Sequence, residues 1–119
     1  MTKICREKEY IAIIANRLKC DESHPIELGF INVKPDLICN GIAYEIECED
    51  KVHYGIGQAL AYQYGGLQAG LIVIINDDNN NKTDQLINFL RWIKNKLNID
   101  IYILKCTNYD CKLIKLFNY

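Results

Sequence analysis

The sequence predicts an α/β fold, a three-layer-like sandwich in which helices flank a central mixed β-sheet. Segments with helix-like apolar spacing alternate along the chain with shorter strand-like segments, which is typical of a sheet covered by helices. Asn40-Gly41 separates two apolar runs, and this dipeptide predicts a tight hairpin. Residues 69–76 form an almost continuous apolar run, as expected of a strand that is buried on both faces.

The first third of the chain predicts a helix, a loop and a strand. Apolar residues recur at helical spacing over residues 3–19 and predict the helix. Residues 20–25 are expected to form the loop, and residues 26–33 have the strand character of alternating side chains. The helical stripe consists of Ile4, Ile11, Ile14, Ala15 and Leu18.

The hairpin at Asn40-Gly41 has one uniformly apolar face and one face that carries charges. Side chains alternate between the two faces of a strand, and directly opposed residues share a face. A slip of one residue would bury the charges, so the register is specified. The register pairs Cys39 with Ile42, Ile38 with Ala43, Leu37 with Tyr44, Asp36 with Glu45 and Lys34 with Glu47. The apolar face holds Leu37, Cys39, Ile42, Tyr44, Ile46 and Cys48.

The second half of the chain predicts two helices and two strands besides residues 69–76. Residues 51–64 and 83–97 have helical spacing, and residues 99–105 and 113–117 have strand character. Asp50 and Thr83 are the expected N-caps of these helices, and Gly65-Gly66 is the expected C-terminal stop of the first. The inward face of the second helix is expected to hold Leu86, Leu90, Ile93 and Leu97.

The composition indicates a globular protein folded as a single domain over residues 1–119. Half of the residues are hydrophobic, and only two are prolines. No apolar run approaches the roughly 20 residues needed to cross a bilayer. The first ten residues are too charged for a signal peptide. We therefore expect an intracellular protein that does not contact a membrane.

The cysteines are expected to be mostly reduced. None of the six forms a Cys-x-x-Cys pair, and the two histidines stand alone, so zinc is not expected. Cys39 and Cys48 occupy apolar strand positions and are predicted to be buried thiols. Cys106 and Cys111 flank a short loop and could form a disulfide.

Asp36 and Glu45 face each other on the charged side of the hairpin, and Glu47 lies two residues farther along that face. Opposed carboxylates destabilise a sheet unless something compensates for their repulsion. Carboxylate oxygens are the ligands that Mg²⁺ and Mn²⁺ prefer. The sequence therefore predicts a site for a divalent metal. The alternative is a solvated sheet face on which Lys34 and Lys51 neutralise the acids.

The succession of Lys34-Pro35-Asp36, a hairpin and Glu45-Ile46-Glu47 resembles the PD-(D/E)XK nuclease superfamily. The expected element order over residues 3–76 is similar to the αβββαβ core of that restriction-endonuclease-like fold. The resemblance implies that Asp36 and Glu45 bind metal and that a Glu of the first helix joins them. Glu7 is a better candidate than Glu9, because Glu7 lies on the inward stripe.

The lysine of the superfamily motif is replaced by Glu47. Glu47 could be an added metal ligand or could help to orient the attacking water. A lysine could instead come from elsewhere, and the candidates are Lys34 and Lys51. The remaining alternative is a site that binds nucleic acid without cutting it.

Gln58 and Tyr62 lie one turn apart on the helix that follows the acidic strand. Their spacing resembles the Gln-x-x-x-Tyr motif of RecB-type nucleases in the same superfamily. The resemblance implies that both lie beside the active site, where Gln58 would bond a water or a phosphate and Tyr62 would contact the nucleic acid. The alternative is that Tyr62 packs in the core while Gln58 is exposed.

These features predict a nuclease that uses Mg²⁺ or Mn²⁺ to hydrolyse phosphodiester bonds, with DNA as its partner. Three alternatives are open: a Holliday junction resolvase acting as a homodimer, a non-catalytic nucleic-acid-binding module on the same fold, and an interaction protein with a merely solvated acidic face. The residues expected at the site are Glu7, Lys34, Asp36, Glu45, Glu47, Gln58 and Tyr62, with Asp36, Glu45 and Glu47 as metal ligands.

Overall fold

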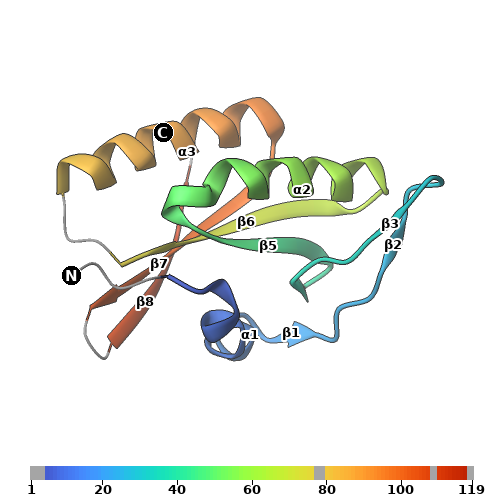
Figure 1. Cartoon of the computed structure of the whole chain (residues 1–119), viewed down its shortest axis with the longest axis horizontal. Coiled ribbons are helices and arrows are strands. Elements are labelled where there is room, and N and C mark those ends of the chain that lie inside the picture. The colour runs from blue at the N-terminus through green and yellow to red at the C-terminus, as the bar shows by residue number, and fades with distance from the viewer. Residues whose placement is uncertain (1–4, 77–79, 108–109, 118–119) are drawn as a thin grey trace.

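A mixed β-sheet of six strands forms the centre of the computed structural model, which describes residues 5–76, 80–107 and 110–117 (Figure 1). The strands lie in the order β1-β4-β5-β6-β7-β8. β5, β6 and β7 run parallel to one another, and the other neighbours pair antiparallel. The predicted α/β class with a mixed sheet is therefore confirmed. The strands are β1 (Cys20–Asp21), β4 (Leu37–Cys39), β5 (Ile42–Cys48), β6 (Gln68–Ile75), β7 (Asp100–Thr107) and β8 (Asp110–Lys115).

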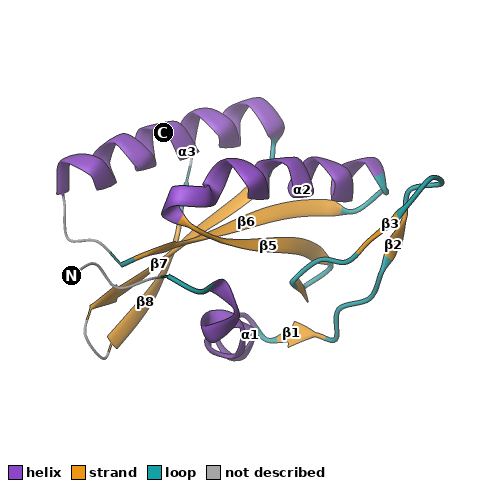
Figure 2. Cartoon of the chain, in the orientation of Figure 1, coloured by secondary structure: helices purple, strands orange, loops and turns teal. Residues whose placement is uncertain are grey.

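Helices cover both faces of this sheet, as Figure 2 shows. On one face lies the 3₁₀ turn η1 (Glu7–Tyr10), which continues into α1 (Ile11–Leu18). On the other face lie α2 (Val52–Tyr64), which follows the 3₁₀ turn η2 (Glu49–Lys51), and α3 (Asn80–Leu97). Among the described residues, no helix has the length and apolar character needed to cross a membrane.

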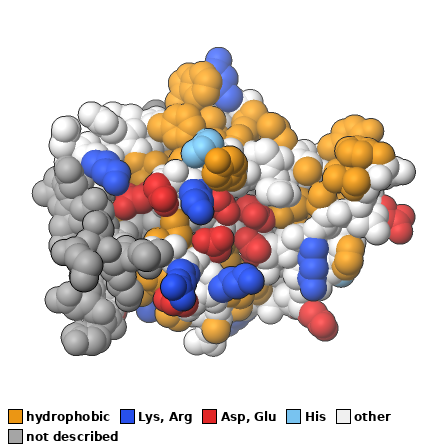
Figure 3. All heavy atoms as spheres, in the orientation of Figure 1, with side chains coloured by type: hydrophobic (Ala, Val, Ile, Leu, Met, Phe, Trp, Pro, Cys, Tyr) orange, Lys and Arg blue, Asp and Glu red, His pale blue; other side chains and the backbone are white. Residues whose placement is uncertain are grey.

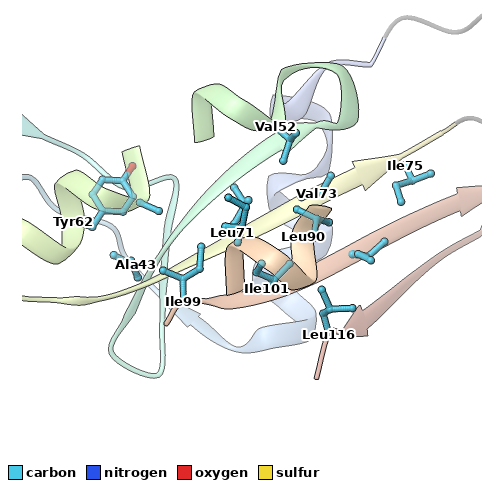
Figure 4. Close-up of a cluster of buried hydrophobic side chains, with 14 of the residues drawn as sticks. Ala43, Val52, Tyr62, Leu71, Val73, Ile75, Leu90, Ile99, Ile101 and Leu116 are labelled. Carbon is cyan, nitrogen blue, oxygen red and sulfur yellow. The ribbon is translucent and has the colours of Figure 1, made fainter. Parts of the chain in front are cut away.

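Two hydrophobic clusters lie on opposite faces of the sheet. Strand β6 contributes to both, with Leu71 and Val73 on the α2 and α3 side and Ile72 and Ile74 on the α1 side. The prediction that this strand is buried on both faces is therefore confirmed. Figure 4 shows the first cluster, in which side chains of α2 and α3 meet side chains of the strands.

The hairpin between β4 and β5 has the predicted register. Leu37 pairs with Tyr44, and Asn40 and Gly41 have positive φ angles of 53° and 79°, as a type I′ turn requires. The predicted apolar face packs against α1, and all its members except the partly buried Ile42 are buried. The predicted pairings of Asp36 with Glu45 and of Lys34 with Glu47 lie beyond the observed ladder, which ends at Leu37 and Tyr44.

Several predictions for residues 3–33 are wrong. Arg6 has extended backbone angles and Lys19 is left-handed, so the helical region runs only from Glu7 to Leu18. Ile4 lies outside the described residues. The expected loop over residues 20–25 contains β1, which pairs with β4.

The single strand predicted for residues 26–33 is in fact a separate hairpin. Its strands are β2 (Ile26–Glu27) and β3 (Asn32–Val33). The chain reverses where Gly29 has a φ of 98° and the Leu28 amide donates to the Ile31 carbonyl at 2.9 Å.

The predicted helix caps are correct only at the C-terminal end of α2. Gly65 donates to the Ala61 carbonyl at 3.0 Å, and Gly66 has a φ of 94°. Asp50 does not cap α2 but lies inside η2. α3 begins at Asn80, which is one turn before the predicted N-cap Thr83. Leu90 and Ile93 are buried as predicted, and Leu86 and Leu97 are partly buried against the same cluster.

All six cysteines are paired. The disulfide Cys106–Cys111, which the sequence left as a possibility, is formed, but the predicted thiols Cys39 and Cys48 are in fact bonded to Cys20 and Cys5. Cys20 pairs with Cys39 across β1 and β4. Because β1 was not predicted, the disulfide between these two cysteines was not predicted either. Disulfides are typical of oxidising compartments. The thiol state of the protein in its native cell would therefore test the expected intracellular location.

Candidate functional site

Asp36 and Glu45 lie together on the sheet face that α2 covers. The Asp36 amide donates to the Tyr44 carbonyl at 3.1 Å, which continues the hairpin beyond β4. The Asp36 carboxylate accepts the Ile46 amide at 2.8 Å, so the side chain reaches across to β5. There it meets Glu45, with which it shares a side-chain hydrogen bond. The two acids therefore lie together, although the regular β4–β5 pairing stops one residue before them.

Burial favours the protonated form of both carboxyls. Burial and, more weakly, the negative charges of Asp36 and Glu47 raise the pKa of Glu45 to about 8, although the bond from Tyr62 opposes this rise. Burial also raises the pKa of Asp36, against the lowering effect of the Ile46 amide. Their mutual hydrogen bond raises the pKa of Glu45 and lowers that of Asp36. Glu45 is thus mostly protonated near neutral pH in the absence of a cation.

Glu47 joins this cluster from the same strand and is half-buried beneath α2. Burial, followed by the charges of Glu7 and Asp36, raises its pKa to about 7, while Lys51 acts in the opposite direction. Burial of a carboxyl beneath a helix requires a close approach of the helix backbone, which Gly55 allows. A Cβ atom on Gly55 would lie 2.6 Å from the Glu47 Cγ atom.

Gly55 is a site residue that the sequence analysis missed. A Cβ atom on Gly55 would also lie 2.7 Å from Leu71 Cδ1. At Gly55 the helix therefore packs closely against both a core side chain and the acidic cluster. The signal in the sequence was a glycine inside a helical pattern, which costs stability unless packing needs it.

The two candidate lysines have different positions. The Lys34 side chain is exposed, and Lys34 contributes its carbonyl oxygen, which lies 3.5 Å from the Tyr62 hydroxyl. The expected Lys34–Glu47 pair is therefore absent from the β4–β5 ladder, because the regular pairing stops before it. Lys51 at the end of η2 is the lysine whose charge lowers the pKa of Glu47.

Glu7 lies near the acids, as the resemblance implied. It occupies the first turn of η1, and its carboxylate lies 3.8 Å from the Cys48 Sγ atom at the end of β5. The negative charge of Glu7 raises the pKa of both Asp36 and Glu47. Four carboxyls from three segments therefore influence one another at this end of β5.

Tyr62 packs in the core, as the alternative to the Gln-x-x-x-Tyr resemblance expected, and its hydroxyl reaches the acids. Its ring is only 1% exposed in the core, and its hydroxyl donates to Glu45 Oε1. Burial and this bond raise the pKa of Tyr62, so the hydroxyl stays protonated and continues to donate. Gln58, one turn earlier on α2, is exposed.

The donor set of this cluster fits a hard divalent cation. Carboxylate oxygens are suitable ligands, and Mg²⁺ usually takes one or two protein carboxylates and completes its shell with waters and substrate phosphates. In the described ranges, no group of three or more His, Cys, Asp or Glu side chains is close enough together to hold a metal ion. Asp36 and Glu45 are the two neighbouring carboxyls that could supply ligands to such a cation, and a bound cation would take the place of the Glu45 proton.

Comparison of the chain with family models, with curated proteins and with solved structures finds no match.

One face of the molecule is mixed in character. Figure 3 shows acidic side chains at the centre of one face, with basic side chains among them and hydrophobic side chains on two sides. Tyr54 on α2 is 64% exposed and its ring lies 4.3 Å from that of His53. Phe30, in the β2–β3 hairpin, is 76% exposed. Exposed aromatic rings of this kind can stack on unpaired bases.

Proposed function

We propose that the protein is a metal-dependent nuclease that hydrolyses phosphodiester bonds in DNA. The observation that carries the proposal is the direct contact of Asp36 and Glu45, two partly buried carboxyls with raised pKa values. Carboxyls crowded in this way repel each other once ionised, and a cation between them removes that cost. Mg²⁺ held by one or two carboxylates is common at sites of phosphoryl transfer.

The order of elements also supports the proposal. Helix α1 precedes β1, β4 and β5, which pair antiparallel in that order, and β6 follows α2 and pairs parallel with β5. This order is compatible with a restriction-endonuclease-like αβββαβ core into which the β2–β3 hairpin is inserted. The acids would then lie on the hairpin of that core, where the superfamily motif has them.

The residues of the cluster have separate tasks in the proposed reaction. Asp36 and Glu45 hold the cation, which supplies charge stabilisation for the transition state when it is bound. Tyr62 donates to Glu45 and so fixes the direction of that carboxyl. Glu47, whose pKa is about 7, can accept a proton from the attacking water near neutral pH.

A non-catalytic nucleic-acid-binding module on the same fold is the second candidate. It is favoured by the acid at the position of the motif lysine and by the exposed Lys34 side chain, which lies outside the ladder. Such a module would bind DNA through the exposed aromatic and basic side chains without cutting it.

Cleavage assays with linear duplex, single-stranded and branched DNA, each with and without Mg²⁺ or Mn²⁺, distinguish the two candidates. The nuclease proposal predicts cutting that requires the cation and is lost in Asp36→Asn and in Glu45→Gln. Asp110→Asn is the matched control, because Asp110 is exposed on β8, three strands away from β5. DNA binding without cutting by the wild type supports the module, and cutting that survives in both site variants refutes the assignment of the acids.

A further inference from the structure

The disulfide Cys5–Cys48 lies directly against the acidic cluster. Cys48 is the last residue of β5 and follows Glu47, and Cys5 lies two residues before Glu7. The Glu7 carboxylate is 3.8 Å from the Cys48 Sγ atom. The other two disulfides join β1 to β4 and β7 to β8 and have no such neighbour in the cluster.

We propose that the Cys5–Cys48 disulfide is a positioning element of the site, which holds the Glu7 carboxylate beside Asp36 and Glu47 and makes the affinity for a divalent cation depend on that bond. This inference rests on the proposed function and adds to it a fourth carboxylate that is placed by a covalent link. Glu7 would strengthen cation binding through its negative charge and not as a ligand, since among the described residues no three acids are close enough together to hold one ion.

The local structure explains why Glu7 needs this link. Downstream, η1 is anchored by Tyr10, which is buried at 7% exposure. Upstream, Arg6 is exposed and extended, and Cys5 is bonded to β5. A 3₁₀ turn of four residues is marginal by itself. Without the disulfide, the described residues before Glu7 would lose their covalent link to β5, and a turn that loses such a link tends to fray.

Opening of the link follows ordinary thiol–disulfide exchange. A dithiol reductant attacks the partly exposed Cys5 sulfur, and Cys48 leaves as a thiolate that takes up a proton. The second thiol of the reductant then attacks the mixed disulfide, releases the Cys5 thiol and completes a two-electron transfer in which the dithiol becomes a disulfide. The proposed site would then have three acids in place and the fourth unanchored.

Two double variants separate positioning from general loss of stability. The first is Cys5→Ser with Cys48→Ser, and the matched control is Cys20→Ser with Cys39→Ser. Mn²⁺ affinity is measured by titration calorimetry, well below the melting temperature of each protein. The proposal predicts a loss of about tenfold in affinity for the first variant, which is the usual effect of removing a supporting group at a metal site. The control should bind as tightly as the wild type.

A third comparison tests whether the disulfide acts through Glu7. Glu7→Gln in the disulfide-bonded protein should lose affinity to the same degree, and adding Cys5→Ser with Cys48→Ser to it should cause no further loss. An equal loss of Mn²⁺ affinity in the control variant, Cys20→Ser with Cys39→Ser, would overturn the inference. A full further loss of affinity when Cys5→Ser and Cys48→Ser are added to Glu7→Gln would also overturn it. If the wild type binds Mn²⁺ and cuts DNA, and the variant Cys5→Ser with Cys48→Ser binds Mn²⁺ as tightly as the wild type, this inference alone is refuted. A wild type that does not bind Mn²⁺ would refute the proposed function as well.

Discussion

Raising the pH of the metal-free protein is expected to destabilise the fold, because Glu45 is held protonated in the folded state. The pKa of Glu45 rises from its ordinary value of 4.5 to about 8, chiefly through burial. A carboxyl whose pKa is raised by folding binds its proton more tightly when folded. Its contribution to stability is therefore fully present below pH 4.5 and is lost as the pH rises through about 8.

The size of this loss follows from the same pKa values. At about 1.4 kcal/mol per pH unit, the range from about pH 5.5 to about pH 8.5 would remove about 3 kcal/mol if Glu45 were fully shielded from water. Glu45 is only partly buried, and screening by solvent reduces the expected loss to about 2 kcal/mol. That is a measurable part of the stability of a domain of this size.

Urea unfolding followed by far-ultraviolet circular dichroism at both pH values measures this loss. Glu45→Gln is the control, because its amide imitates the protonated carboxyl and does not titrate. The variant should retain a smaller dependence, caused by Glu47 with its pKa of about 7 and by Asp36, whose pKa burial raises. Mn²⁺ should remove most of the loss in the wild type, since a cation that binds the ionised pair stabilises the folded state. Equal pH dependence in wild type and variant, or a wild type that is more stable at high pH, would refute the reasoning.

Four further substitutions test the surroundings of the acids. Gly55→Ala should cost about 1–3 kcal/mol in urea unfolding, because its methyl group would overlap a β5 side chain. Gly57→Ala in the same helix meets open space and should gain up to about 1 kcal/mol, so equal effects would contradict the packing. Tyr62→Phe removes the donor to Glu45 and should weaken Mn²⁺ binding in calorimetry by about tenfold, whereas unchanged affinity would show that this bond does not support the metal. Gln58→Ala should leave the melting temperature unchanged because the side chain is exposed, and unchanged DNA cleavage would remove Gln58 from the site.

The central hairpin could be predicted from the sequence because its determinants are local. Asn40-Gly41 specifies the turn, and the alternation of apolar and charged residues specifies the register. These two facts were sufficient to bring Asp36 and Glu45 together. The buried strand β6 and the stop of α2 at Gly65-Gly66 were predictable for the same reason.

The remaining features depend on contacts between distant segments. The strands β1 and β2 have two residues each, too few to show a periodic pattern. The partner of Cys48 is 43 residues away, and spacing alone cannot select it. The closeness of Gly55 to Glu47 appears only when α2 is packed on β5.

Anomalous diffraction from crystals soaked in Mn²⁺ tests most directly whether the two hairpin acids form a metal site. A peak at roughly 2–2.6 Å from carboxylate oxygens of both Asp36 and Glu45 is the predicted result. Crystals in which Mn²⁺ binds elsewhere while these two carboxyls keep their shared hydrogen bond would contradict the nuclease proposal at its foundation.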